Sequence, residues 1–431
     1  MKLTIEHVGK VAKGTITLSG ITAVAGPNKS GKSTIGRTLM TLGTLLRRMD
    51  ELVRTRKLRV FLSKVGESIG ITELSEIRFR RLVDSDYQAD DLLSPGFWTN
   101  KETTDALFSK LARTMSPIRA RSFRKQIEEL GDDEIPKILQ DILNQDETEI
   151  MCDIVDEQFR TVFSGQINSL CRPATEAYVG VSLRADATDD YWVSFKDGSL
   201  HGHGEQLSAA FPATFYLEPL HFLDFLPVAD RFPLFTDRYR AGDCAWRKVL
   251  RANPAGDEDL SLEEKRQLEE LLGEIKTILG GELGFRDGHL QFREESLSSQ
   301  GEWLELDNIA SGMKSMSMLC QALKNRSLRR GSLLIIDEPE SNLHPEWQIR
   351  FAAVLVRLWK RLGLRVLVAT HSPYFLKGLE MASAHQGCLE DFSSYLMKPD
   401  DAAGGSIAVA VTGRLNEIYK VFYDPLNNLM A

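Results

Sequence analysis

The sequence contains few cysteines and no long apolar run. Five cysteines are scattered among 431 residues without a Cys-x-x-Cys pair, which excludes a disulfide framework and a zinc-knuckle spacing. No stretch approaches the roughly 18 consecutive apolar residues of a membrane-spanning helix, and residues 1–7 carry no apolar segment of signal length. Basic residues are fewer than acidic ones, 53 against 61, which argues against wholesale coating of nucleic acid. We therefore expect a cytoplasmic protein without membrane contact.

The composition is that of ordinary globular protein. Apolar residues make up 42% and charged residues 26% of the chain, enough for a large core in two or three folding units. Near both ends of the chain, short β-rich or apolar runs alternate with segments of helical composition. The β-rich runs are 3–6, 15–18, 21–24, 332–336 and 365–369, and the helical segments are 33–48 and 346–362. Apolar strands separated by helices are typical of a mostly parallel sheet covered on both faces, so we predict an α/β fold.

Residues 44–280 have a different character. They consist mainly of long charged stretches with apolar residues at three- and four-residue spacing, which predicts helices that pack on one face. A β-rich patch at 178–217 interrupts them, and no heptad pattern is sustained, so a long coiled coil is not expected. We predict that residues 1–43 and 281–431 form one α/β head, and that residues 44–280 are a mainly helical domain inserted into it.

A glycine-containing loop between a predicted strand and a predicted helix carries the first motif. It fits G-x-x-x-x-G-K-[ST], in which backbone amides surround phosphates and the following helix adds its positive end. Lys32 is expected to reach the β- and γ-phosphates, and the Ser33 hydroxyl to hold Mg²⁺. The sequence therefore predicts binding of a nucleoside triphosphate, ATP with Mg²⁺. The residues of the loop are Gly26, Pro27, Asn28, Lys29, Ser30, Gly31, Lys32, Ser33 and Thr34.

Two later strands end in polar residues with matching chemistry. The apolar run 333–336 is followed by Asp337, which can help to hold Mg²⁺ beside Ser33 because ligands collect at the carboxyl ends of parallel strands. Glu338 comes next and is placed to activate the attacking water as a general base. His371 follows a third apolar strand and lies 34 residues after Asp337, a separation that leaves room for one helix and one strand. We expect it to sense the γ-phosphate at the same edge of the sheet.

Three further patterns leave alternatives open. Ser311-Gly312 precedes an apolar helical segment, and such a helix start can bind an anion or can simply be capped by the serine. Residues 201–205 (His-Gly-His-Gly-Glu) could ligate a metal but fit a loop more readily. Basic residues cluster at 47–64 and 78–125, either as a solvated helix face or as a surface for DNA, RNA or an acidic protein.

Taken in order, the P-loop, the Ser-Gly segment, the acidic strand end and the histidine resemble the motifs of an ABC-type ATPase head of the RecF/SMC/OLD kind. The run 337–348, Asp-Glu-Pro-Glu-Ser-Asn-Leu-His-Pro-Glu-Trp-Gln, is similar to the D-E-P-E-x-x-L-H-P run of OLD-like prokaryotic ATPases. Residues 216–220 (Tyr-Leu-Glu-Pro-Leu) and 415–429 also resemble a stand-alone branch of that group. The resemblance is specific over residues 1–43 and 283–431.

The resemblance implies a homodimer or higher oligomer in which two heads enclose two ATP molecules. Ser311, Gly312 and Lys314 of one copy would act on the nucleotide held by the other, and residues 341–344 would connect the two sites. The sequence departs from the family in one place, because it reads Ala-Ser-Gly-Met-Lys where Leu-Ser-Gly-Gly-Gln is usual. Gln88 is a candidate for the family's Q-loop glutamine by order alone.

The resemblance also implies two functions. OLD-like ATPases without a Toprim nuclease domain commonly serve in two-gene anti-phage systems such as PARIS or Septu, and Asp400-Asp401 is not the D-x-D cluster of a Toprim domain. This implies a sensor, scaffold or regulator of a separate effector, a nuclease encoded by a neighbouring gene, with DNA or a phage protein as the trigger. The alternative is a RecF/SMC-like ATPase that binds DNA in repair or chromosome maintenance.

Overall fold

The computed structural model divides the chain into two compact units. It describes residues 1–68, 89–113, 117–129, 133–169, 171–172, 175–184, 188–218, 261–286, 289–294, 303–305, 311–402 and 404–430. The first unit comprises Met1–Arg47 and Glu157–Ala431, and the second comprises Arg48–Asp156. None of the helices in these described ranges has the length and apolar content that crossing a bilayer requires.

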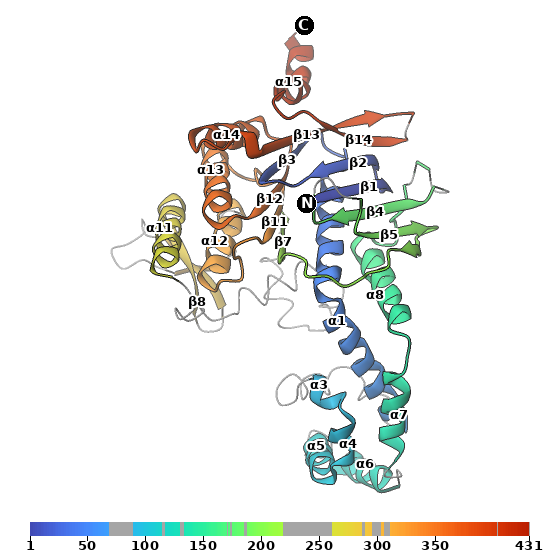
Figure 1. Cartoon of the computed structure of the whole chain (residues 1–431). Coiled ribbons are helices and arrows are strands. Elements are labelled where there is room, and N and C mark those ends of the chain that lie inside the picture. The colour runs from blue at the N-terminus through green and yellow to red at the C-terminus, as the bar shows by residue number, and fades with distance from the viewer. Residues whose placement is uncertain are drawn as a thin grey trace. The chain divides into compact units, whose positions relative to one another are not determined.

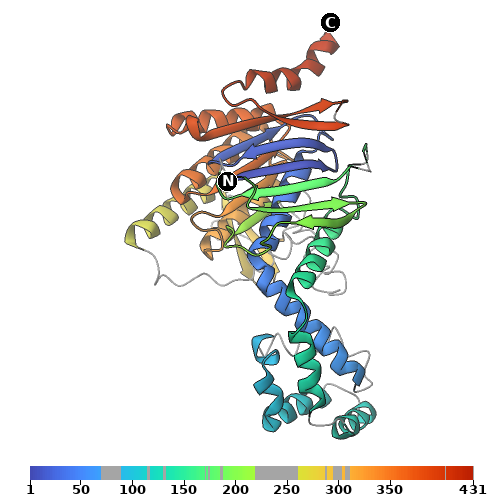
Figure 2. The same ribbon diagram turned by 45° about the vertical axis from the view of Figure 1, so that its right-hand side comes forward.

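The first unit is built on a mixed sheet, which Figures 1 and 2 show from two directions. Its described strands follow the spatial order β6-β5-β4-β1-β2-β14-β13-β3-β12-β11-β7. They are β1 (Lys2–Val8), β2 (Val11–Thr17), β3 (Ile21–Ala25), β4 (Ala177–Ser182), β5 (Tyr191–Lys196), β6 (Ser199–His203), β7 (Thr214–Leu217), β11 (Leu333–Asp337), β12 (Arg365–Thr370), β13 (Phe392–Asp400) and β14 (Gly405–Ala410).

Five neighbouring strands of this sheet, β13, β3, β12, β11 and β7, are parallel to one another. All residues of β3 and β11 are buried, as expected for strands covered on both faces. The predicted α/β fold with a large parallel sheet is therefore confirmed. The sheet is extended by antiparallel pairs among β1, β2, β4, β5 and β6. The predicted motifs lie at the ends of the parallel strands.

Helices cover both faces of the parallel strands (Figure 1). On one face lie α12 (Ser311–Lys324), α13 (Pro345–Leu362) and α14 (Pro373–His385), whose apolar residues form one core cluster with Leu334 and Ile336 of β11. The intervening Ile335 points the other way, toward Gly36 near the start of α1 (Lys32–Ser68). Alternate residues of one strand thus pack against different helices, as the period of two requires.

Smaller elements complete the first unit. The helix α11 (Leu262–Leu279) is tied to α13 by Glu274, whose carboxylate pairs with Arg357 at 2.7 Å and Arg361 at 3.3 Å. A separate three-stranded antiparallel sheet contains β8 (Gly281–Arg286), β9 (His289–Glu294) and β10 (Trp303–Glu305). The last described helix is α15 (Asn416–Met430).

The second unit is helical and has its own core. Among the described residues it contains the later part of α1, the start of α8 (Glu147–Val162) and five helices between them. These are α3 (Ala89–Leu92), α4 (Pro95–Thr99), α5 (Lys101–Arg113), α6 (Pro117–Glu129) and α7 (Glu134–Leu143). Trp98 lies in this core with its ring 5.0 Å from that of Phe61, and its indole nitrogen donates to the Leu92 carbonyl at 2.7 Å.

The domain boundaries predicted from the sequence differ from these two units. The predicted insertion covers residues 44–280, but the helical unit ends at Asp156, and α1 runs through the first predicted boundary without a break. The β-rich patch belongs to the head, because β4 pairs with β1 and β7 pairs with β11. Strand pairing over more than 100 residues decides this assignment, and local composition carries no information about the pairing partner.

Candidate active site

The P-loop connects the end of β3 at Ala25 to the start of α1 at Lys32. Three of its residues adopt positive φ angles, Gly26 at 157°, Lys29 at 64° and Gly31 at 90°. A Cβ atom at Gly31 would lie 2.9 Å from Cγ2 of Val11 in β2, so both the backbone angle and the space favour glycine there. The loop therefore brings its backbone and the amino end of α1 to one place, an arrangement suited to an anion.

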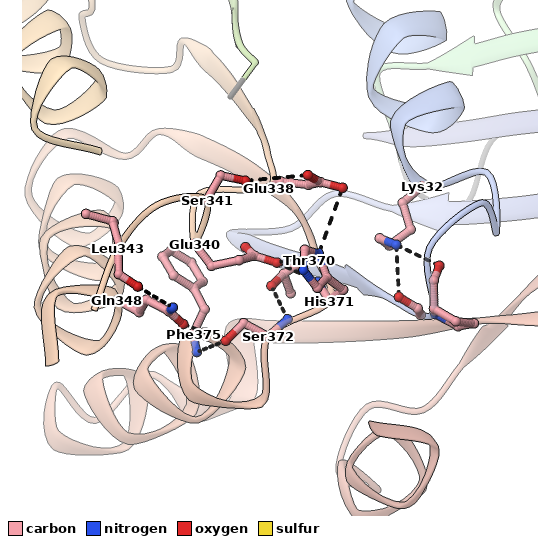
Figure 3. Close-up of polar contacts among 12 residues, drawn as sticks. Lys32, Glu338, Glu340, Ser341, Leu343, Gln348, Thr370, His371, Ser372 and Phe375 are labelled. Atoms are coloured by element: carbon pink, nitrogen blue, oxygen red, sulfur yellow. Dashed lines mark hydrogen bonds and ion pairs between the residues drawn. The ribbon is translucent and has the colours of Figure 1, made fainter. Parts of the chain in front are cut away.

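Lys32 is the first residue of α1, and its ammonium group is hydrogen-bonded to the backbone of the loop (Figure 3). Its Nζ donates to the carbonyl oxygens of Gly26 and Pro27, each at 2.9 Å. Burial lowers the pKa of Lys32, while the carboxylates of Glu338 and Asp337 act in the opposite direction. The oxygens of a bound phosphate can replace these two carbonyl oxygens as acceptors of the Lys32 ammonium group.

Asp337 ends β11 beside the P-loop helix and is buried. Its Oδ2 accepts a hydrogen bond from the Tyr216 hydroxyl at 3.2 Å, whereas its Oδ1 is buried without a hydrogen-bond partner. Burial raises the pKa of Asp337 to about 6, against the lowering effect of the nearby Ser33 hydroxyl. Oxygen donors of this kind are those that Mg²⁺ prefers, so the unpartnered Oδ1 and the Ser33 hydroxyl fit the predicted cation.

Glu338 and His371 face each other at the ends of adjacent strands (Figure 3). The two side chains approach to 3.8 Å between Glu338 Oε1 and His371 Nδ1. Glu338 has a φ angle of 46°, and its backbone N–H donates to the Ala369 carbonyl at 2.8 Å. The chain thus turns sharply after β11 while remaining bound to β12, which aims the Glu338 carboxylate toward the histidine.

A second glutamate, Glu340, holds the loop that carries His371. Its buried Oε1 accepts from the backbone N–H of His371 at 2.7 Å and lies 3.0 Å from Nδ1 of the same residue. Burial raises the pKa of Glu340, and His371 acts to lower it. In the sequence Glu340 is one residue of the run 337–348 with no evident role, because only the fold brings it against the end of β12.

Further hydrogen bonds connect this loop to α13 and α14. Ser372 caps α14 by accepting from the Phe375 N–H at 3.3 Å, and its hydroxyl donates to Gln348 Oε1 at 2.5 Å. The amide of Gln348 donates in turn to the Leu343 carbonyl at 2.9 Å. The two bonds of Gln348 link the histidine loop to the loop at 341–344 through groups that are largely buried (Figure 3).

The strand next to β11 adds two residues that the resemblance included within 216–220 without giving them a role. Tyr216 lies in β7, and Glu218 directly follows that strand. Arg37 of α1 donates from Nε to Glu218 Oε1 at 3.1 Å, and its charge also acts on Tyr216. A signal was present in the sequence, because a carboxylate directly after an apolar strand is the pattern that identified Asp337.

The other predicted sites have different outcomes. Helix α12 begins at Ser311 and includes Gly312, but the side chain of Ser311 is outside the described part of the structure. Lys314 is buried. Gln88 also lies outside them. The candidate metal ligands His201 and His203 lie on strand β6 rather than in a loop. The described residues contain no group of three potential metal-ligating side chains from His, Cys, Asp and Glu.

Much of the first predicted basic cluster is neutralised by acidic partners. Arg48 pairs with Glu51 at 2.8 Å, Arg54 with Asp90 at 3.1 Å, and the buried Lys57 with Glu147 at 2.7 Å. In the second cluster, Arg121, Arg124 and Lys125 on α6 are exposed, and Arg78, Arg80 and Arg81 lie outside the described residues. Of the three paired cations of the first cluster, only Lys57 belongs to the packing of the helical unit, because Arg54 and its partner Asp90 are exposed.

Comparison with known proteins finds one family and several remote structural likenesses. A family model described as "AAA domain, putative AbiEii toxin, Type IV TA system" matches residues 214–377. No curated protein sequence matches the chain. An SMC head bound to the C-terminal winged-helix domain of ScpA has 12% identity and a TM-score of 0.42, covering 97% of this chain and 98% of that one.

Two further structures have similar coverage and lower scores. The SMC head domain from Thermotoga maritima has 12% identity and a TM-score of 0.35 over 95% of this chain and 98% of that one. The ADP conformation of an ATP-binding cassette of an ABC transporter has 10% identity and a TM-score of 0.34 over 99% and 96%. At this level these likenesses identify neither a function nor a partner for the chain.

The P-loop lies beside an acidic strand end, and the matching family model adds a likeness to an AAA domain. The first unit therefore contains a P-loop domain that is similar to this family over residues 214–377. The matched region begins with β7 and extends into α14. It includes Asp337, Glu338 and His371, and Lys32 of the P-loop lies 305 residues before Asp337.

Proposed function

We propose that this protein hydrolyses ATP. The observation that carries the proposal is the juxtaposition of Glu338 and His371, 3.8 Å apart, at the sheet edge where Lys32 and Asp337 also lie. Lys32 would bind the β- and γ-phosphates, Glu338 would accept a proton from the attacking water, and His371 would contact the γ-phosphate. Ser33 and Asp337 would hold Mg²⁺, which supplies charge neutralisation to the phosphates when bound.

Replacing Glu338 by Gln tests this assignment. Glu338→Gln keeps the shape but removes the base, so ATP hydrolysis is expected to fall about a hundredfold or more while ATP binding is retained. Glu346→Gln is the matched control, because Glu346 is an exposed glutamate in the same region and pairs with Arg350. Hydrolysis by Glu338→Gln within a few fold of the wild-type rate would remove Glu338 as the base.

We further propose that two copies close around ATP. In this arrangement Ser311, Gly312 and Lys314, at the start of α12, would act on the nucleotide of the other copy. Support comes from the sequence resemblance and from the position of these residues at a helix N-terminus, which suits a phosphate. Sedimentation of Glu338→Gln with and without ATP is expected to show ATP-dependent dimers. Adding Ser311→Arg should abolish these dimers without weakening ATP binding, and dimers that persist would contradict the assignment.

The wider role that we propose is regulation of a separate effector, a nuclease, in prokaryotic anti-phage defence. The description of the matching family names a toxin of a type IV TA system, which supports a role in a system of this general kind. The acidic partners of Arg48, Arg54 and Lys57 also leave these cations less available to DNA. ATP-driven closure would transmit a trigger, DNA or a phage protein, to the effector.

The alternative is a DNA-binding ATPase of repair or chromosome maintenance. The exposed Arg121, Arg124 and Lys125 on α6 favour it. Capture of tagged Glu338→Gln protein from its host with ATP, followed by mass spectrometry and nucleic-acid extraction, separates the two. A near-stoichiometric protein partner that is lost with Lys32→Ala supports effector regulation. Protected DNA without a protein partner, with affinity that falls steeply as salt rises, supports the alternative.

A further inference from the structure

Tyr216 and Asp337 come together because of how two parallel strands pair. β7 lies parallel to β11 with Tyr216 opposite Ile335 and Leu217 opposite Ile336. Ile335 and Asp337 are two residues apart and so share one face of the sheet. That face is turned toward α1, where a Cβ on Gly36 would contact both Ile335 and Tyr216. The Tyr216 hydroxyl reaches Asp337 Oδ2 at 3.2 Å on this side.

The direction of the Tyr216 hydroxyl hydrogen follows from its partner. A carboxylate has acceptors only, so the phenolic hydrogen is donated to Asp337 Oδ2. Arg37 donates to Glu218 at 3.1 Å, and its positive charge acts on both Tyr216 and Asp337.

The two carboxylate oxygens of Asp337 have different surroundings. Oδ2 accepts the tyrosine hydrogen, while Oδ1 is buried and has no hydrogen-bond partner. We propose that Tyr216 is a positioning residue for magnesium binding. Its hydroxyl occupies Oδ2 of Asp337 and so directs Oδ1 toward the cation. The inference rests on the proposed binding of Mg²⁺ and ATP at this site.

Packing leaves the tyrosine ring little freedom. The ring is buried, and a Cβ atom at Gly36 would lie 3.0 Å from its Cε2. Since Phe has the same ring, Tyr216→Phe is expected to keep the packing and to remove only the hydroxyl. Tyr395→Phe is a matched control from the same unit: Tyr395 is also buried, and its hydroxyl accepts a hydrogen bond from the Thr17 N–H at 2.9 Å.

The test measures ATP binding at equilibrium, once with excess Mg²⁺ and once with EDTA, on the full-length chain. For Tyr216→Phe we expect unchanged affinity in EDTA and a roughly tenfold smaller gain in affinity on adding Mg²⁺, the size of effect known for groups that support a metal ligand. Tyr395→Phe should keep the wild-type gain. In hydrolysis assays, the Mg²⁺ concentration for half-maximal rate should rise for Tyr216→Phe while the KM for ATP at saturating Mg²⁺ stays close to that of the wild type.

Several results would overturn the proposal. A wild-type gain with Mg²⁺ in Tyr216→Phe would show that the hydroxyl does not position Asp337. Equal losses in EDTA and in Mg²⁺ would assign Tyr216 to the nucleotide pocket as a whole. Failure of the proposed function is distinct, because the wild-type chain itself would then bind no ATP.

Discussion

The buried carboxylate of Asp337 makes the stability of the nucleotide-free protein depend on pH. Its pKa is raised by burial from 3.8 to about 6, a shift of about two units, which corresponds to about 3 kcal/mol. Because the folded-state pKa is raised, the folded protein favours the protonated carboxyl. This contribution to stability is fully present below about pH 4, and it is lost as the pH rises through about 6.

Replacing Asp337 by Asn mimics the protonated form and removes this pH dependence. At pH 7.5, in EDTA and without nucleotide, we expect Asp337→Asn to unfold at a higher temperature than the wild type. For a unit of this size, about 3 kcal/mol corresponds to roughly 4 °C in Tm. The difference should shrink toward zero near pH 4. Saturating Mg²⁺ should stabilise the wild type and have little effect on the variant.

Thermal unfolding measured between pH 4 and pH 8 checks this prediction. Asp401→Asn controls for the loss of one negative charge, because Asp401 is exposed and belongs to the same unit. A Tm difference that does not change with pH would refute the reasoning. So would an Asp337→Asn protein that is less stable than the wild type at pH 7.5, since Asp337 would then be stabilised in its charged form.

Two other substitutions test the loops of the site. Glu340→Ala leaves the buried N–H of His371 without its 2.7 Å acceptor, so stability should fall by about 1–3 kcal/mol and hydrolysis should fall with it. Glu340→Gln retains an acceptor and should keep most of the stability, and thermal unfolding that fails to separate the two variants would contradict this role. Gly31→Ala places a Cβ 2.9 Å from Val11 at a φ angle of 90°, so ATP binding measured by titration should be lost or much weakened. Gly273→Ala is its control, because a Cβ there meets nothing within 4 Å, and normal ATP binding by Gly31→Ala would show that the loop tolerates the side chain.

The motifs that could be predicted from the sequence are those made of consecutive residues. The strand, glycine loop and helix around Lys32 form as expected because the signals for a β-run, a turn and a helix follow one another locally. The helix predicted at 346–362 is observed at Pro345–Leu362, where His344 caps the start and Gly363 ends it with a φ angle of 59°. Asp337 and His371 also lie where predicted, because each directly follows an apolar strand and parallel strands end at one edge.

What the sequence by itself determined was therefore the chemistry of each short segment, together with the α/β fold class. The tertiary structure decided which distant segments are neighbours. Tyr216 meets Asp337 across 121 residues only because β7 pairs with β11, and β4 joins the head only because it pairs with β1. Local propensity and hydrophobic period specify a strand and its buried face, but the choice of partner strand depends on the packing of the whole sheet. The supporting contacts of Asp337 and His371 thus appear only when the chain has folded.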